Sequence, residues 1–157
     1  MINSSGDKMD ITKGFQIEEP NIFIRWGIPE SELLKEIAIA NPKKITDGYF
    51  AIECTSLGGL NHMLGFHFEP KVCGQLIELE FFRKRQPNLP DISVSFQEFQ
   101  QHLESAFGSP ATKRKNGAYD VFGWVFGNIT ITHLIQDRFE PEEHVRIKYF
   151  PATSSKA

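Results

Sequence analysis

Five histidines are the residues of this chain best suited to acid–base or metal chemistry, so their spacing is considered first. They are His62, His67, His102, His133 and His144. A zinc site needs converging ligands, commonly close pairs at i, i+4 on a helix or i, i+2 on a strand, and no such pair occurs. His62 and His67 are five residues apart, which places them on opposite faces of a strand. His133 lies among alternating isoleucines and is best explained as a hydrogen-bonded core residue. We therefore predict no metal site.

The motifs that hold a nucleophile, a phosphate or a cofactor are also missing from the sequence. No Gly-x-Ser-x-Gly elbow occurs, and Gly58-Gly59 is followed by neither Lys nor a strand-to-helix setting. Cys54 and Cys73 have no strongly basic neighbourhood, so neither is expected to be a reactive thiol, and whether they pair stays open. We predict no catalytic residue and no cofactor.

Carboxylates gather in two places, and both suit binding better than catalysis. Glu78 and Glu80 point to the same side of one expected strand, as residues on a solvated strand face do. Acid–base chemistry would require such a pair to lie in a cleft. The second group is the segment Asp137–Glu143, expected as a hairpin loop or, alternatively, as a recognition patch for a basic partner. The candidate partner-binding residues are Glu78, Glu80, Arg138, Glu140, Glu142 and Glu143.

Strands expected from period-two hydrophobicity carry most of these residues. The expected strands are Gly14–Ile17, Asn21–Trp26, Gly48–Thr55, Asn61–Glu69, Gln75–Phe82, Tyr119–Phe126, Ile129–Ile135 and His144–Phe150. Their apolar side chains fall on one face, as in an antiparallel sheet with one wet face.

Two helices are expected, one in each half of the chain. The first covers Glu30–Ala40, where Asn41-Pro42 ends it. The second begins at Ser95, because Ser95-Phe96-Gln97-Glu98 matches a capping box with Val94 and Phe99 as a hydrophobic staple. Gly108 ends the second helix.

The two halves match each other in element order. Phe68-Glu69-Pro70 recurs as Phe139-Glu140-Pro141 at an offset of 71 (139 − 68), and Tyr49 matches Tyr119 at an offset of 70 (119 − 49). Such offsets are typical of a duplicated unit. We predict an α+β fold in which two tandem α-β-β-β units, residues 22–86 and 92–151, join into one antiparallel sheet. Both helices would cover one face of this sheet.

Composition restricts the classes of partner. The 157 residues suit one domain, expected over residues 10–151 with flexible termini at 1–9 and 152–157. A net charge of −3 argues against nucleic acid, and the basic runs Arg83-Lys84-Arg85 and Lys113-Arg114-Lys115 are expected as solvated loops. No signal peptide or membrane-spanning stretch occurs, so we expect no membrane association and a cytoplasmic location.

The general style of the chain resembles a known class of protein. It combines many Phe residues, a strand end at Trp26-Gly27, a helix exit at Phe107-Gly108-Ser109-Pro110 and strands that end in Phe-Glu-Pro. In this style it resembles the small α+β immunity proteins that bacteria encode beside contact-dependent or secreted toxins. The resemblance implies a non-catalytic protein that binds and blocks a cognate toxin, often a basic nuclease.

Two alternatives remain at the level of the sequence. One is a small-ligand binding domain or enzyme with a pocket between sheet and helices, lined by Tyr119, Trp124 and His133. The other is a subunit that uses its sheet to form a homodimer.

Overall fold

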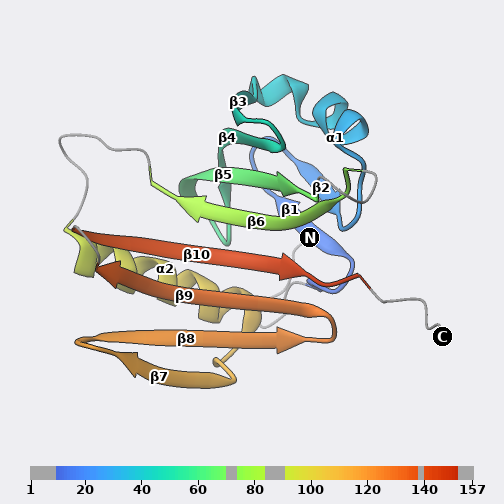
Figure 1. The fold of residues 1–157 in the computed structure, drawn as a ribbon. Coiled ribbons are helices and arrows are strands. Elements are labelled where there is room, and N and C mark those ends of the chain that lie inside the picture. Colours follow the sequence, from blue (N-terminus) through green and yellow to red (C-terminus); the bar gives the residue numbers. More distant parts are fainter. Residues whose placement is uncertain (1–9, 70–73, 84–90, 138–139, 152–157) are drawn as a thin grey trace.

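An eight-stranded antiparallel sheet dominates the computed structural model, which describes residues 10–69, 74–83, 91–137 and 140–151 (Figure 1). The strand order is β3-β4-β5-β6-β10-β9-β8-β7. The strands are β3 (Lys43–Thr46), β4 (Tyr49–Ser56), β5 (Leu60–Phe68), β6 (Leu76–Phe82), β7 (Thr112–Asn116), β8 (Tyr119–Phe126), β9 (Ile129–Asp137) and β10 (Pro141–Tyr149). Each half of the chain supplies four consecutive strands, and the halves meet where β6 pairs with β10. The fold is α+β, as predicted.

A second layer covers one face of the sheet, and no helix or strand of the described residues covers the other, here called the open face. This layer consists of the hairpin β1 (Gly14–Ile17)–β2 (Ile22–Arg25), α1 (Glu30–Glu36), the short 3-10 helix η1 (Ala38–Ala40) and α2 (Ile92–Phe107). In Figure 1, α2 lies behind β9 and β10. The hairpin reaches the same face, because Phe15 of β1 meets Phe81 of β6 edge-on at 5.3 Å between ring centroids.

One continuous core lies between the two layers. The side chains that alternation predicts to point inward are buried in it, including Phe50, Ile52, Leu64, Phe66, Trp124, Ile131 and Ile147. Because the core includes residues from Ile11 to Ile147, the two halves pack as one body.

Each half has four strands where three were expected. The additional strands, β3 and β7, form the two edges of the large sheet, and all their residues are exposed. The basic run Lys113–Lys115 lies in β7, so its prediction as a loop was wrong. Lysine on an exposed edge strand discourages pairing with a strand of another molecule. Both faces of β7 are exposed, so its sequence shows no alternation of apolar and polar residues. Of the other basic run, Arg83 follows β6, and Lys84 and Arg85 lie outside the described residues.

The helix termini also differ from the sequence-based expectation. The N-cap of α2 is Asp91, four residues before the expected Ser95, and its carboxylate accepts from the backbone N–H of Ser93 at 3.2 Å. The predicted capping box of Ser95 and Glu98 is therefore wrong, and Val94 is 54 % exposed, which excludes the staple. The first helix is also shorter than expected, because α1 ends at Glu36 and continues only as η1.

Candidate functional site

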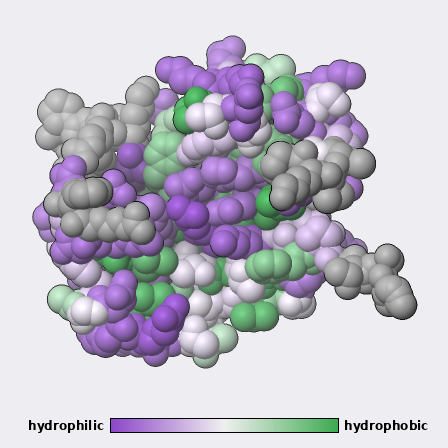
Figure 2. All heavy atoms as spheres, viewed as in Figure 1, coloured by the Kyte–Doolittle hydropathy of each residue, from purple (hydrophilic) through white to green (hydrophobic). Residues whose placement is uncertain are grey.

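Polar side chains gather on the open face of the sheet where the two halves join. Tyr49, His67, Glu78, Glu80 and Arg146, here called the junction cluster, come from β4, β5, β6 and β10. The strand register makes them neighbours, because Tyr49 is opposite His67, His67 is opposite Glu78, and Glu80 is opposite Arg146. Figure 2 views this face and shows hydrophilic side chains across its centre, with hydrophobic ones on either side.

Ion pairs fix the charged members of the junction cluster. His67 Nε2 lies 2.9 Å from Glu80 Oε1, and the Arg146 guanidinium lies 3.4 Å from Glu78 and 3.9 Å from Glu80. The hydrogen bond with His67, aided by the charge of Arg146, lowers the pKa of Glu80 against the effect of burial. The side chains of Glu78 and Glu80 are only 14 % and 17 % exposed, so the two carboxylates are held rigidly beneath the surface.

Tyr49 forms the aromatic side of the junction cluster. Its ring stacks on His67 at 4.1 Å between centroids and 15° between planes. Burial, together with the charge of Glu80 and a hydrogen bond to it, raises the pKa of Tyr49 to about 12. The ring occupies the space above Gly65, where an added Cβ would lie 2.6 Å from Tyr49 Cε1. Glycine at position 65 therefore permits this stacked arrangement.

This contact gives a test of the cluster's geometry. We expect Gly65→Ala to displace the Tyr49 ring from its place beside Glu80, so that the pKa of Tyr49 falls from about 12 toward 10. Absorbance at alkaline pH measures the titration. Gly123→Ala is the matched control, because its Cβ would approach Thr112 Oγ1 equally closely, also at 2.6 Å, in the other half of the sheet. An unchanged titration in Gly65→Ala, or the same change in both variants, would contradict the geometry.

A cleft adjoins the cluster where β6 and β10 separate. Their last paired residues are Phe81 and Val145, and beyond this pair the two strands enclose a cavity of about 380 Å³. Strand alternation places Phe82, Glu142 and His144 on the open-face side of the cavity. Arg83 and Glu143 line its inner side, where Ser95 and Phe99 of α2 complete the wall. The cavity is thus lined by residues from both faces of the sheet and from α2.

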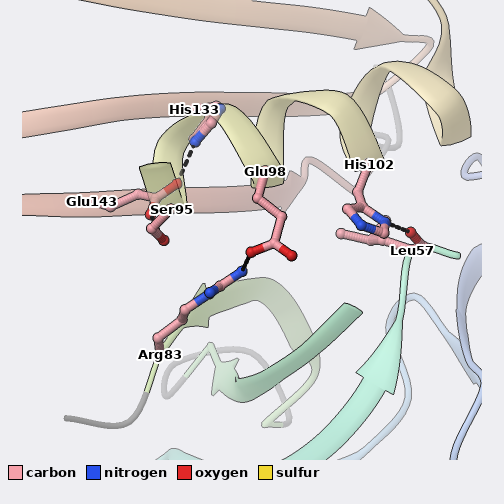
Figure 3. Close-up of polar contacts among 7 residues, drawn as sticks. All are labelled: Leu57, Arg83, Ser95, Glu98, His102, His133 and Glu143. Carbon is pink, nitrogen blue, oxygen red and sulfur yellow. Dashed lines mark hydrogen bonds and ion pairs between the residues drawn. The ribbon is translucent and has the colours of Figure 1, made fainter. Parts of the chain in front are cut away.

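A buried polar network lies at the inner end of the cleft (Figure 3). Ser95 Oγ donates to Glu143 Oε1 at 2.6 Å, and the second carboxylate oxygen lies 2.7 Å from His133 Nε2. The other ring nitrogen of His133 lies 2.8 Å from Gln100 Oε1, and the ring stacks on Phe96 at 3.8 Å. Burial lowers the pKa of His133, with the Glu143 hydrogen bond opposing. Because Ser95 contacts the carboxylate and not the imidazole, the arrangement orients groups without activating the hydroxyl as a nucleophile.

Two further contacts tie α2 to the N-terminal half, as Figure 3 also shows. Arg83 Nη2 pairs with Glu98 Oε1 at 2.5 Å, and His102 Nδ1 lies 2.5 Å from the carbonyl oxygen of Leu57. The helix of the second half therefore holds both halves together around the cleft.

The residues predicted to bind a partner occupy different environments. Glu78 and Glu80 lie in the junction cluster, and Glu142 is exposed at the mouth of the cleft. Glu143 is only 11 % exposed and belongs to the buried network. Glu140 is exposed beside the start of β10, and Arg138 lies outside the described residues.

The residues predicted to line a pocket are not part of this cleft's wall. Trp124 is buried and donates through Nε1 to the carbonyl of Gly108 at 2.8 Å, while Tyr119 begins β8 in the C-terminal half. His133 is separated from the cleft by Glu143. Arg146 and Ser95 were not among the site residues predicted from the sequence. Arg146 alternates with the inward-facing Val145 and Ile147, so strand parity alone would have placed it on the open face.

The described residues show neither a metal centre nor a reactive cysteine. No group of three or more His, Cys, Asp or Glu side chains in the described ranges is arranged to hold a metal ion. Cys54 is a free, buried thiol, and burial raises its pKa to about 12. Cys73 lies outside the described residues. Among the described helices, none has the length and apolar character needed to cross a membrane.

No family model matches the chain, and no curated protein is similar to it in sequence. One similar solved structure is a DUF4309 family protein (YjgB) from Bacillus subtilis, with 11 % sequence identity, 78 % of each chain covered and a TM-score of 0.44.

Proposed function

We propose that this protein is a non-catalytic protein-binding module whose binding surface is the open face of the sheet, centred on the junction cluster. The observation that carries this proposal is a sheet face that no described helix or strand covers, with paired charged and aromatic groups at its centre. Tyr and Arg are enriched among residues that dominate protein interfaces, and Tyr49 and Arg146 hold this central position. Charged groups already paired within the surface present fixed charges to a partner and contribute to specificity.

The finer proposal is a bacterial, cytoplasmic immunity protein that binds and blocks a cognate toxin. Its support is the resemblance of the sequence to such proteins and the carboxylates around the open face. Glu140 and Glu142 are exposed at the start of β10, and the net charge is −3, which favours a basic partner. The partner would be the product of a neighbouring gene.

Co-expression with that neighbouring gene product tests the proposal. We expect the wild-type chain to protect cells from the toxin and to bind it directly. Tyr49→Ala and Arg146→Ala should each weaken binding by about thirtyfold, corresponding to roughly 2 kcal/mol. Glu36→Ala, an exposed site on α1, should leave binding unchanged. A harmless neighbour, or full binding by both open-face variants, would show that the proposal is wrong.

A small-ligand binding domain is the second candidate, and the cleft between β6 and β10 favours it. Its volume of about 380 Å³ lies at the low end of the range for ligand pockets, and its wall mixes aromatic and polar groups. A protein of this kind would keep its activity in Arg146→Ala, because Arg146 is not part of the cleft's wall, and lose it when the cleft is filled.

We also propose that the two halves arose by tandem duplication. Each half is a helix followed by four antiparallel strands. In both halves the first of these strands, β3 or β7, forms an edge of the sheet, and the last, β6 or β10, lies at the junction between the halves. The cluster and the cleft therefore lie where the two units meet.

A further inference from the structure

We infer that the cleft between β6 and β10 binds one basic side chain, lysine or arginine, presented by a partner protein. The inference rests on the proposed function only for the partner that carries the side chain. Its basis is the position, the charge and the apolar walls of the cleft.

The position of the cleft suits a side chain that enters from the open face. After Phe81 and Val145, the facing edges of β6 and β10 no longer pair with each other, although their other edges stay paired with β5 and β9. The resulting opening leads from Glu142 and His144 on the open face to Ser95 and Phe99 on α2. An extended lysine side chain reaches about 6 Å from its Cα, and that of arginine slightly further.

Among the described residues, carboxylates outnumber basic side chains in the wall of the cleft, which includes Glu80, Glu142 and Glu143 but, of Lys and Arg, only Arg83. Arg83 is bound to Glu98, and Arg146 lies against the two carboxylates of the junction cluster. Within the described residues, no Lys or Arg pairs with Glu142 or Glu143. The Glu143 carboxylate instead accepts from the Ser95 hydroxyl and contacts the His133 ring. Glu142 lies 3.5 Å from His144 Nε2, so neither carboxylate has a Lys or Arg partner among the described residues, and an entering cation would complement their negative charge.

The walls between these carboxylates suit the aliphatic part of a basic side chain. Phe82, Phe99 and Ile92 contribute apolar surface, against which a lysine or arginine stem packs while its charged end reaches polar groups. Arg83 Cζ lies 5.2 Å from the Phe99 centroid, so the guanidinium of Arg83 already covers part of this ring. The cleft therefore offers both an apolar channel and an anionic end.

Titration of the ¹⁵N-labelled full chain with N-acetyl-arginine methylamide and N-acetyl-lysine methylamide tests the site directly. We expect chemical-shift changes centred on Phe82, Glu142 and His144, with a Kd on the order of 1 mM for at least one probe. N-acetyl-norleucine methylamide, which has a neutral side chain of similar shape, should bind at least about tenfold more weakly. Equal binding of the neutral compound, or shifts away from these residues, would refute the inference.

Two variants locate the binding within the cleft. Ile92→Trp fills the inner end from the start of α2, and Glu142→Lys reverses the charge at the mouth, so each should weaken probe binding by about tenfold or more. Glu36→Lys is the matched control, because it makes the same change in net charge on α1, at the opposite end of β6 (Figure 1). If the cleft variants bind the probes as the control does, the cleft is not the site.

Binding of the toxin partner separates this inference from the proposed function. Loss of partner binding in Tyr49→Ala with full binding in Ile92→Trp would refute the basic side chain in the cleft and leave the proposed function intact. Full partner binding in all of these variants would refute the open-face function, and the probe titration would then decide the cleft on its own.

Discussion

Replacing Glu143 by Leu is expected to lower the free energy of unfolding by about 3 kcal/mol. The Glu143 carboxylate is the acceptor for Ser95 and the partner of His133, a residue with no exposed side-chain surface. Leucine fills similar space but accepts no hydrogen bond, so a ring N–H would remain in the core without an acceptor. That N–H has lost its hydrogen bonds to water and gains none in the protein. The decrease in the free energy of unfolding is therefore larger than the net contribution of an ordinary hydrogen bond. Urea unfolding of the two proteins measures the difference.

The neighbouring residue supplies the control for this prediction. Glu142 is 62 % exposed, and Glu142→Leu should change the free energy of unfolding by no more than about 0.5 kcal/mol. Combining Glu143→Leu with His133→Phe removes both partners and keeps a ring stacked on Phe96. The double variant should be more stable than the sum of the single losses by about 2 kcal/mol. Additive losses would mean that Glu143 and His133 do not depend on each other.

Local patterns predicted most of the strands because burial on one face leaves a period of two in the sequence. Gly14–Ile17 and Tyr119–Phe126 were expected with the bounds that β1 and β8 have. The edge strands β3 and β7 escaped this reasoning, since all their side chains are exposed and no face is apolar. A strand whose only packing is the hydrogen-bonded ladder leaves no hydrophobic signal.

Contacts between distant residues set the limit of prediction at the site. Ser95 and Glu98 match a capping box, but Ser95 instead bonds to Glu143, 48 residues along the chain, and Glu98 pairs with Arg83. The Asp91 side chain offers an equally local alternative, so tertiary contacts decided between two N-caps of similar strength. Glu143 itself was expected among exposed carboxylates. Because Glu143 lies two residues before the inward-facing Val145, strand alternation already indicated that its side chain is buried. Its hydrogen-bond partners, Ser95 and His133, could be identified only from the three-dimensional structure.

Acidification should destabilise the protein through His62, and this is the second large effect we expect. His62 is buried, and its Nδ1 donates to the carbonyl of Met63 at 3.0 Å while Nε2 lies 2.5 Å from the Ser56 hydroxyl. Burial lowers the pKa of His62 to about 4, from 6.5 for an exposed histidine. Between these two pH values the unfolded chain binds a proton that the folded protein does not. The contribution is therefore fully present above pH 6.5 and is lost as the pH falls toward 4, by about 3 kcal/mol in total.

Urea unfolding between pH 4 and pH 7.5 tests this dependence in the wild type and in the double variant Ser56→Ala/His62→Leu. The double variant replaces both hydrogen-bonding partners, so it avoids leaving the serine hydroxyl unpaired. Near pH 5, its free energy of unfolding should vary less steeply with pH than that of the wild type, by up to about 1.4 kcal/mol per pH unit, the slope of one proton. His133 and Glu80, whose lowered pKa values act in the same direction, remain in both proteins and cancel in the difference. Ser56→Ala alone keeps the histidine and should retain the wild-type slope, because burial is the main cause of the low pKa. Parallel curves for the wild type and the double variant would mean that His62 titrates alike in the folded and unfolded chains.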